Sequence, residues 1–174
     1  LLGHTKKSIR KESCWALSNI TAGSTSQVQS VLESGCLPKL IEILKDDDEV
    51  VQKEAVWAIA NYASGGSIEQ LRHLVAFPNC VDRITERFEH AYEGLVRIAI
   101  DCFECMLNKC DKNNVDGFNL AAWIAAMSCN GRTRLANLVD RHIEPSISEK
   151  AKDLEERFFA PESASGQAMK QFPT

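Results

Sequence analysis

Apolar side chains recur every three or four residues along most of the chain, which is the spacing of one face of an α-helix. Two segments show this pattern most clearly. Their inner faces are Ile9, Ser13, Ala16, Leu17, Ile20 and Val51, Ala55, Ala58, Ile59, Tyr62. Shorter helices are predicted over residues 27–33, 37–45, 68–75 and 80–90, with breaks at Gly35 and Pro78-Asn79. The pattern therefore predicts an all-α protein.

The two clearest segments are copies of one another. Residues 9–20 and 51–62 share Lys, Glu, Trp, Ala and Asn in the same order, 42 positions apart. Gly23 and Gly65 follow the copies, where we expect them to close the helices. A period in the low forties is typical of armadillo and HEAT units, which contain two or three helices each. The repeat predicts a right-handed α-solenoid of armadillo repeats.

The later units are weaker copies. A helix with apolar spacing runs from about Leu95 to Met106, but Asp101 stands at the Trp position and Cys105 at the Asn position. A fourth unit is predicted over residues 120–128, 134–142 and 147–159. We expect residues 1–160 to form about three and a half repeats of a longer solenoid, with an artificial first edge, and residues 161–174 to form a flexible tail.

Composition narrows the class of protein. The 174 residues are 44% hydrophobic and 25% charged, as in an ordinary globular chain. The net charge of −4 argues against binding to nucleic acid or to an anionic membrane, and no apolar run approaches the roughly 18 residues of a membrane span. The seven cysteines are odd in number and without paired spacing, which predicts free thiols in a reducing compartment.

Three residues of each copy lie away from its inner face. At about 100° per residue, the tryptophan points roughly 145° from the centre of that face and the asparagine roughly 105° from it. A glutamate lies one turn before the tryptophan, so the three side chains form one ridge. The two ridges are Glu12, Trp15, Asn19 and Glu54, Trp57, Asn61.

An extended basic peptide suits such ridges. A carboxamide bonds to a peptide main chain in both directions, an indole packs on the stem and charge of Lys or Arg, and a glutamate complements that charge. Neighbouring helices pack about 8–10 Å apart and an extended chain advances about 3.3 Å per residue, so one repeat matches about three ligand residues. The alternative is that the tryptophans fill the seam between neighbouring units.

These segments resemble importin-α, the armadillo adaptor family that binds nuclear localisation signals. The resemblance rests on residues 8–12 and 18–23 around Trp15, on residues 53–55 and 64–66 around Trp57 and Asn61, and again on residues 147–151. It weakens through the third copy. It implies that the chain covers roughly the seventh to tenth repeats of that family.

The resemblance also implies a function and a set of partners. Signals bind this family at a major site on early repeats and a minor site on later ones. The minor-site positions match Trp15, Asn19, Trp57, Asn61 and Glu54, with Glu12 and Ser18 as neighbours. The implied partners are basic nuclear localisation signal peptides of cargo proteins, importin-β through a segment absent from this chain, and a nuclear export receptor at the last repeats. The protein would shuttle between cytoplasm and nucleus, without a cofactor.

Other groups of residues favour simpler interpretations. Cys102, Cys105 and Cys110 lie on one predicted helix with no histidine near them in sequence, which argues against a metal site. Residues 46–49 form an acidic run that fits a solvated turn before a helix better than a site that steers a ligand. Trp123 lies in an apolar stretch and is predicted to be core. No residues assemble a catalytic centre, so we expect no enzyme. The alternative function is an armadillo scaffold of adhesion or signalling type that binds another protein partner.

Overall fold

The computed structural model describes residues 1–112, 121, 124–125, 130–141 and 144–159, and helices dominate this part of the chain. The long helices are α1 (Lys7–Thr21), α4 (Glu49–Gly65), α7 (Glu93–Lys112) and α10 (Pro145–Phe158). The shorter ones are α2 (Thr25–Glu33), α3 (Leu37–Asp46), α5 (Ile68–Ala76), α6 (Cys80–Glu86), the 3-10 helix η1 (Arg87–Glu89) and α9 (Gly131–Asp140).

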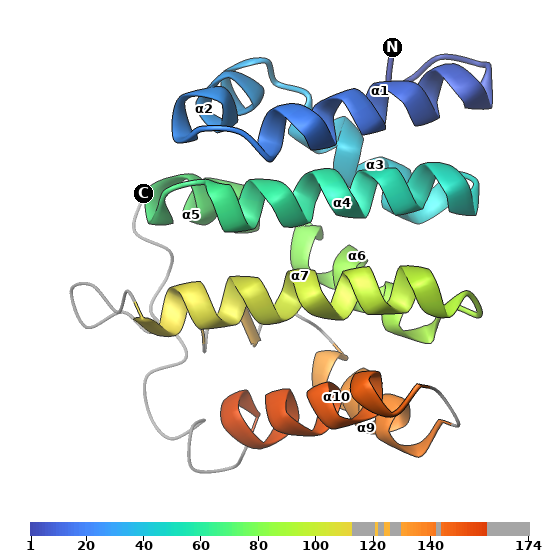
Figure 1. The fold of residues 1–174 in the computed structure, drawn as a ribbon, viewed down its shortest axis with the longest axis vertical. Coiled ribbons are helices and arrows are strands. Elements are labelled where there is room, and N and C mark those ends of the chain that lie inside the picture. Colours follow the sequence, from blue (N-terminus) through green and yellow to red (C-terminus); the bar gives the residue numbers. More distant parts are fainter. Residues whose placement is uncertain (113–120, 122–123, 126–129, 142–143, 160–174) are drawn as a thin grey trace.

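The helices form two layers that repeat along the molecule. The long helices lie side by side in the front layer of Figure 1, where α1 packs along α4, and α4 along α7. The shorter helices lie behind them, and α10 packs on both α9 and α7. This arrangement confirms the predicted all-α solenoid.

Local sequence signals place several helix ends where the pattern predicts them. Ser24 begins α2 with a capping box, in which its hydroxyl accepts the Gln27 N–H and the Gln27 side chain accepts the Ser24 N–H. Ser67 and Gln70 repeat this box at the start of α5. The predicted break at Pro78-Asn79 is confirmed, because Asn79 has a φ of 62° just before α6.

Other ends differ from the prediction. Gly65 is the last residue of α4, and the C-cap of α1 is Ala22. Neither Gly23 nor Gly65 has the left-handed backbone of a glycine that ends a helix. The helix predicted over residues 80–90 divides into α6 and η1. Most of the helix predicted over 120–128, with Trp123, lies outside the described residues, as does the predicted tail.

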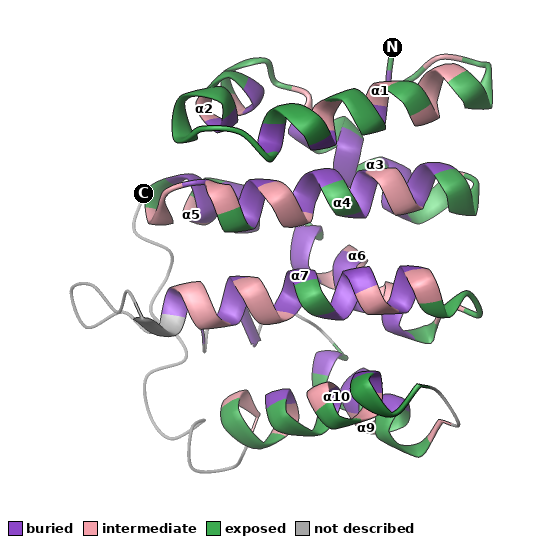
Figure 2. Cartoon of the chain, viewed as in Figure 1, coloured by how far each residue is buried: buried purple, intermediate pink, exposed green. Residues whose placement is uncertain are grey.

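The hydrophobic core combines buried residues of the long and the short helices, and Figure 2 shows that α4 and α7 are more deeply buried than α1. The predicted inner face of α4 is entirely buried. The inner face predicted for α1 is largely wrong, because none of its five residues is buried: Ala16 is exposed and Ile20 is 40% exposed. The residues that α1 buries are Cys14, Ser18 and Thr21. Helix α4 lies between α1 and α7, whereas α1 has a long neighbour on one side among the described residues. The same sequence pattern is therefore buried in α4 and partly open in α1.

Charged side chains connect successive units. Arg10 donates to both carboxylate oxygens of Asp47, with Nε–Oδ2 and Nη2–Oδ1 distances of 2.5 and 2.6 Å. Lys109 on α7 donates to the carbonyl oxygens of Ala63 and Ser64 at 2.9 and 3.1 Å, at the end of α4. The Lys109 contacts satisfy helix-end carbonyls of α4, and both sets of contacts connect neighbouring units.

The acidic run has the structural role favoured by its sequence. Asp48 is the N-cap of α4, where its carboxylate accepts the N–H of Val50 at 3.2 Å. It also pairs with Lys7 of α1 at 3.0 Å. Negative charge at a helix N-terminus is favourable, so the run needs no ligand to explain it.

A candidate peptide-binding face on adjacent long helices

Two tryptophans lie exposed on neighbouring helices. Trp15 on α1 is 53% exposed and Trp57 on α4 is 43% exposed, although most large apolar side chains of the described residues are buried. The two helices pack along each other, and the tryptophans occupy the same register in their repeats. The rings therefore lie outside the core packing, as the helical angles predict.

The two predicted asparagines differ in their surroundings. Asn19 is exposed on α1. Asn61 is half-buried on α4, and its Nδ2 donates to the backbone carbonyl of Ser18 at 3.0 Å. A carboxamide has two N–H donors and an oxygen with two lone pairs, so this bond orients Asn61 and leaves capacity for a ligand. The bond also ties the second ridge to the first.

Acidic side chains accompany both tryptophans. Glu12 is exposed and its Oε1 pairs with Lys11 Nζ at 3.4 Å. Glu54 is half-buried on α4. Burial raises the pKa of the Cys14 thiol to about 12, and the charges of Asp47 and Glu54 add to that effect.

Ser18 is the predicted site residue that the structure does not present on the surface. It is 7% exposed, and its hydroxyl donates to the backbone carbonyl of Trp15 at 2.8 Å. Its own carbonyl accepts the Asn61 amide. Ser18 thus orients Asn61 through its backbone carbonyl. Matching single residues to a family pattern does not reveal this role.

The ridge does not continue onto α7. Asp101 occupies the Trp position, is exposed and pairs with Lys150 of α10. Cys105 occupies the Asn position and is half-buried. Burial raises the pKa of the Cys105 thiol, which keeps it neutral. Two repeats, on α1 and α4, therefore carry the Glu–Trp–Asn set.

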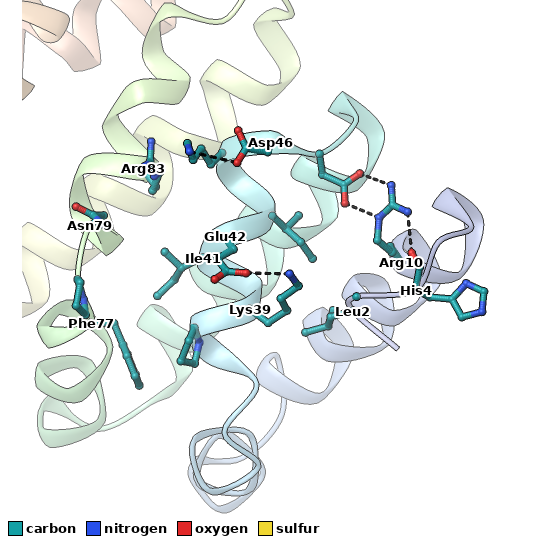
Figure 3. A pocket seen from close by; sticks show the side chains of 16 residues that line it. Leu2, His4, Arg10, Lys39, Ile41, Glu42, Asp46, Phe77, Asn79 and Arg83 are labelled. Atoms are coloured by element: carbon teal, nitrogen blue, oxygen red, sulfur yellow. Dashed lines mark hydrogen bonds and ion pairs between the residues drawn. The ribbon is translucent and has the colours of Figure 1, made fainter.

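A separate hollow of about 680 Å³ lies along α3, away from these ridges (Figure 3). Its walls include Leu2, Ile41 and Phe77, and it contains none of the predicted site residues. Its charged groups are largely paired, as in the Lys39–Glu42 contact of 2.8 Å. It offers no convergent set of polar groups to a small ligand.

The described part of the chain gives no support for a metal-binding site or for a reactive thiol. No group of three or more His, Cys, Asp or Glu residues is placed there to hold a metal ion. Burial raises the pKa of the Cys80 and Cys110 thiols to about 12 and that of Cys102 well above its usual range. None of the described helices has both the length and the apolarity to cross a membrane.

The stacked two-layer units define the chain as an armadillo-repeat solenoid. The family model of the Armadillo/beta-catenin-like repeat matches residues 1–22 and 24–64. In Arabidopsis thaliana, importin subunit alpha-4 is 36% identical over 161 residues, which are 90% of this chain and 29% of that protein. The chain is an armadillo-repeat protein related to the importin subunits alpha. It spans less than a third of that relative.

Further comparisons agree on family and fold. Importin subunit alpha-2 of Caenorhabditis elegans is 50% identical over 51 residues, 29% of this chain and 10% of that protein. A computationally designed armadillo repeat protein for modular peptide recognition superposes with a TM-score of 0.77 at 25% identity, over 91% of this chain and 61% of its own. A designed armadillo repeat protein in complex with the peptide (KR)4 matches with a TM-score of 0.58 at 25% identity, over 91% and 79% of the two chains.

Proposed function

We propose that this chain is the part of a nuclear import adaptor that binds basic nuclear localisation signal peptides across the Trp–Asn pairs of α1 and α4. The observation that carries the proposal is the exposure of Trp15 and Trp57 in the same register on two helices that pack along each other. The coarser role in nuclear import follows from the names of its relatives, importin subunits alpha.

The aromatic rings would hold the cationic side chains. An indole face attracts an ammonium or guanidinium group through its ring electrons and covers the aliphatic stem. Glu12 and Glu54 lie one turn before each tryptophan and add charge complementarity. Lysine and arginine are thus favoured over neutral side chains at each tryptophan.

The asparagines would hold the peptide main chain. Asn19 is exposed, and Asn61 is already oriented by its bond to the Ser18 carbonyl. Because the asparagines contact backbone, the sequence of the ligand is selected mainly by its cationic side chains. Two repeats match about six residues of extended peptide.

The structural comparison supports this ligand class. The designed protein that was solved with (KR)4 has the same architecture, and its peptide alternates lysine and arginine. A net charge of −4 also favours a basic ligand over an acidic one. No specific observation on the described residues supports the alternative function, an armadillo scaffold of adhesion or signalling type.

Fluorescence anisotropy with a labelled Lys/Arg hexapeptide tests the proposal. We expect micromolar binding or weaker, because two repeats offer few contacts. Trp15→Ala with Trp57→Ala should weaken it at least tenfold, since each lost cation–π contact is worth about 1 kcal/mol. Asn19→Ala with Asn61→Ala should weaken it to a similar degree, since each lost hydrogen bond contributes about 1 kcal/mol. Asn137→Ala, an exposed asparagine on α9, is the matched control. Absent binding, or binding that survives both double variants, would refute the proposal.

The remaining partners stay predictions. Binding of importin-β through a segment outside this sequence, and of an export receptor at the last repeats, follows from the family resemblance, and so does shuttling between cytoplasm and nucleus. Co-precipitation of an export receptor with the chain, with and without residues 131–159, would test the second of these.

A further inference from the structure

A cation of the chain itself occupies α7 at the register position that follows the two tryptophans. Lys150 Nζ of α10 pairs with Asp101, which stands 44 positions after Trp57, and with Glu104 Oε2 at 2.8 Å. Asp101 and Glu104 have side chains that are 49% and 27% exposed. Partial burial lowers the pKa of Lys150, but its bonds to both carboxylates outweigh this and raise the pKa overall. The ammonium therefore stays charged at neutral pH.

Three polar contacts follow the seam between α7 and α10. Lys150 is at its middle, Arg97 pairs with Glu144 at one end, and Arg157 Nη2 donates to Asn108 Oδ1 at 2.5 Å at the other. The seam holds Lys150 against α7, so the lysine is not a freely moving surface side chain.

We propose that Lys150 sets the length of basic peptide that the face accepts, because it occupies the place on α7 where a third cationic side chain would bind. This inference rests on the proposed peptide-binding function. A peptide that crosses α1 and α4 reaches α7 next, since α4 packs along α7. There it meets no indole, and both carboxylates that would bind a cation are already paired with Lys150, which leaves one net negative charge among the three groups. Basic residues beyond about six therefore add little affinity.

Lys150→Gln releases both carboxylates and makes them available to a ligand. The probes are a Lys/Arg hexapeptide, nonapeptides with three further basic residues at either end, and nonapeptides with three neutral residues instead. We expect the wild-type chain to bind all of them equally. Lys150→Gln should bind one basic nonapeptide about three- to fivefold more tightly, with the hexapeptide and neutral nonapeptides unchanged.

Two matched variants separate this effect from a general change of charge on α10 and from a loosened seam between α7 and α10. Lys152→Gln makes the same change of charge on the same helix, where Lys152 is 67% exposed and 3.9 Å from Glu156. Arg157→Gln breaks another contact of the same seam without releasing a carboxylate on α7. Neither should improve binding of a basic nonapeptide. An equal gain in either variant, or no gain in Lys150→Gln, would overturn the proposal.

A second measurement covers the case in which Lys150→Gln unfolds α10. Asp101→Asn with Glu104→Gln in the wild-type background leaves the Lys150 ammonium on α7 without these two carboxylates, so one basic nonapeptide should bind about two- to fivefold more weakly than the matching neutral nonapeptide, with the hexapeptide unchanged. Equal or tighter binding of both basic nonapeptides in this variant would show that Lys150 does not occupy the third cation position, and would overturn the proposal. Failure of the wild-type chain to bind the hexapeptide would instead refute the proposed function itself.

Discussion

Tyr62 carries a hydroxyl that the core does not satisfy. The side chain is 0% exposed, and no described residue offers its oxygen a hydrogen-bond partner. The equivalent positions of the neighbouring units hold Ile20 and Met106, both apolar. Burial without a partner costs about 1–3 kcal/mol for a hydroxyl, and the contacts of the oxygen atom return part of that. We therefore expect Tyr62→Phe to raise the free energy of unfolding by about 1 kcal/mol.

Urea denaturation followed by circular dichroism measures this change. A gain of about 1 kcal/mol corresponds to roughly 2–4 °C in melting temperature for a chain of this size. Tyr92→Phe is the matched control, because Tyr92 is 41% exposed; the stability of this variant should stay within about 0.5 kcal/mol of wild type. A loss of more than about 1 kcal/mol in Tyr62→Phe would show that the hydroxyl is bonded, and would refute the reasoning.

Three further changes test the packing and the junctions. Phe103→Ala should lower the free energy of unfolding by about 3–5 kcal/mol, because the ring is fully buried against another aromatic side chain; a loss below about 1 kcal/mol in urea would contradict this packing. Arg134→Gln should cost about 1.5–3 kcal/mol in the same assay, since its side chain is 9% exposed and bonds to Asp82 at 2.8 Å; an unchanged midpoint would contradict that junction. Hydrogen bonds from Arg10 lower the pKa of Asp47, so the pair stabilises the fold at neutral pH. This contribution is lost as pH falls from the ordinary aspartate range through the lowered pKa, and the stability difference between wild type and Asp47→Asn should shrink over that interval.

Much of the fold is predictable because the repeat imposes the same helical period on successive units. The buried face of α4 and the capping boxes of α2 and α5 follow from local patterns alone. The face of α1 does not, because burial depends on neighbours: Ala16 and Ile20 have the pattern of a core, but among the described residues α1 packs along one long helix and α4 along two.

The candidate site is predictable to a similar degree. Helical angles suffice to place Trp15 and Trp57 outside the core. They do not show that Ser18 lies beneath Asn61, because that contact joins residues 43 positions apart in different repeats. Nor do they reveal the role of Lys150, since its partners lie 46 and 49 positions earlier and its own segment shows no Trp–Asn pattern.

Indole N–H resonances of the ¹⁵N-labelled chain report most directly on the central claim, that the exposed tryptophans on α1 and α4 contact one basic peptide. Each signal is assigned by substituting one tryptophan with phenylalanine, and a Lys/Arg hexapeptide is then added in steps. We expect the signals of Trp15 and Trp57 to shift together along one saturable curve, and an Asp/Glu hexapeptide to move neither. Signals that stay in place at saturating peptide, or a shift confined to Trp123, would contradict it.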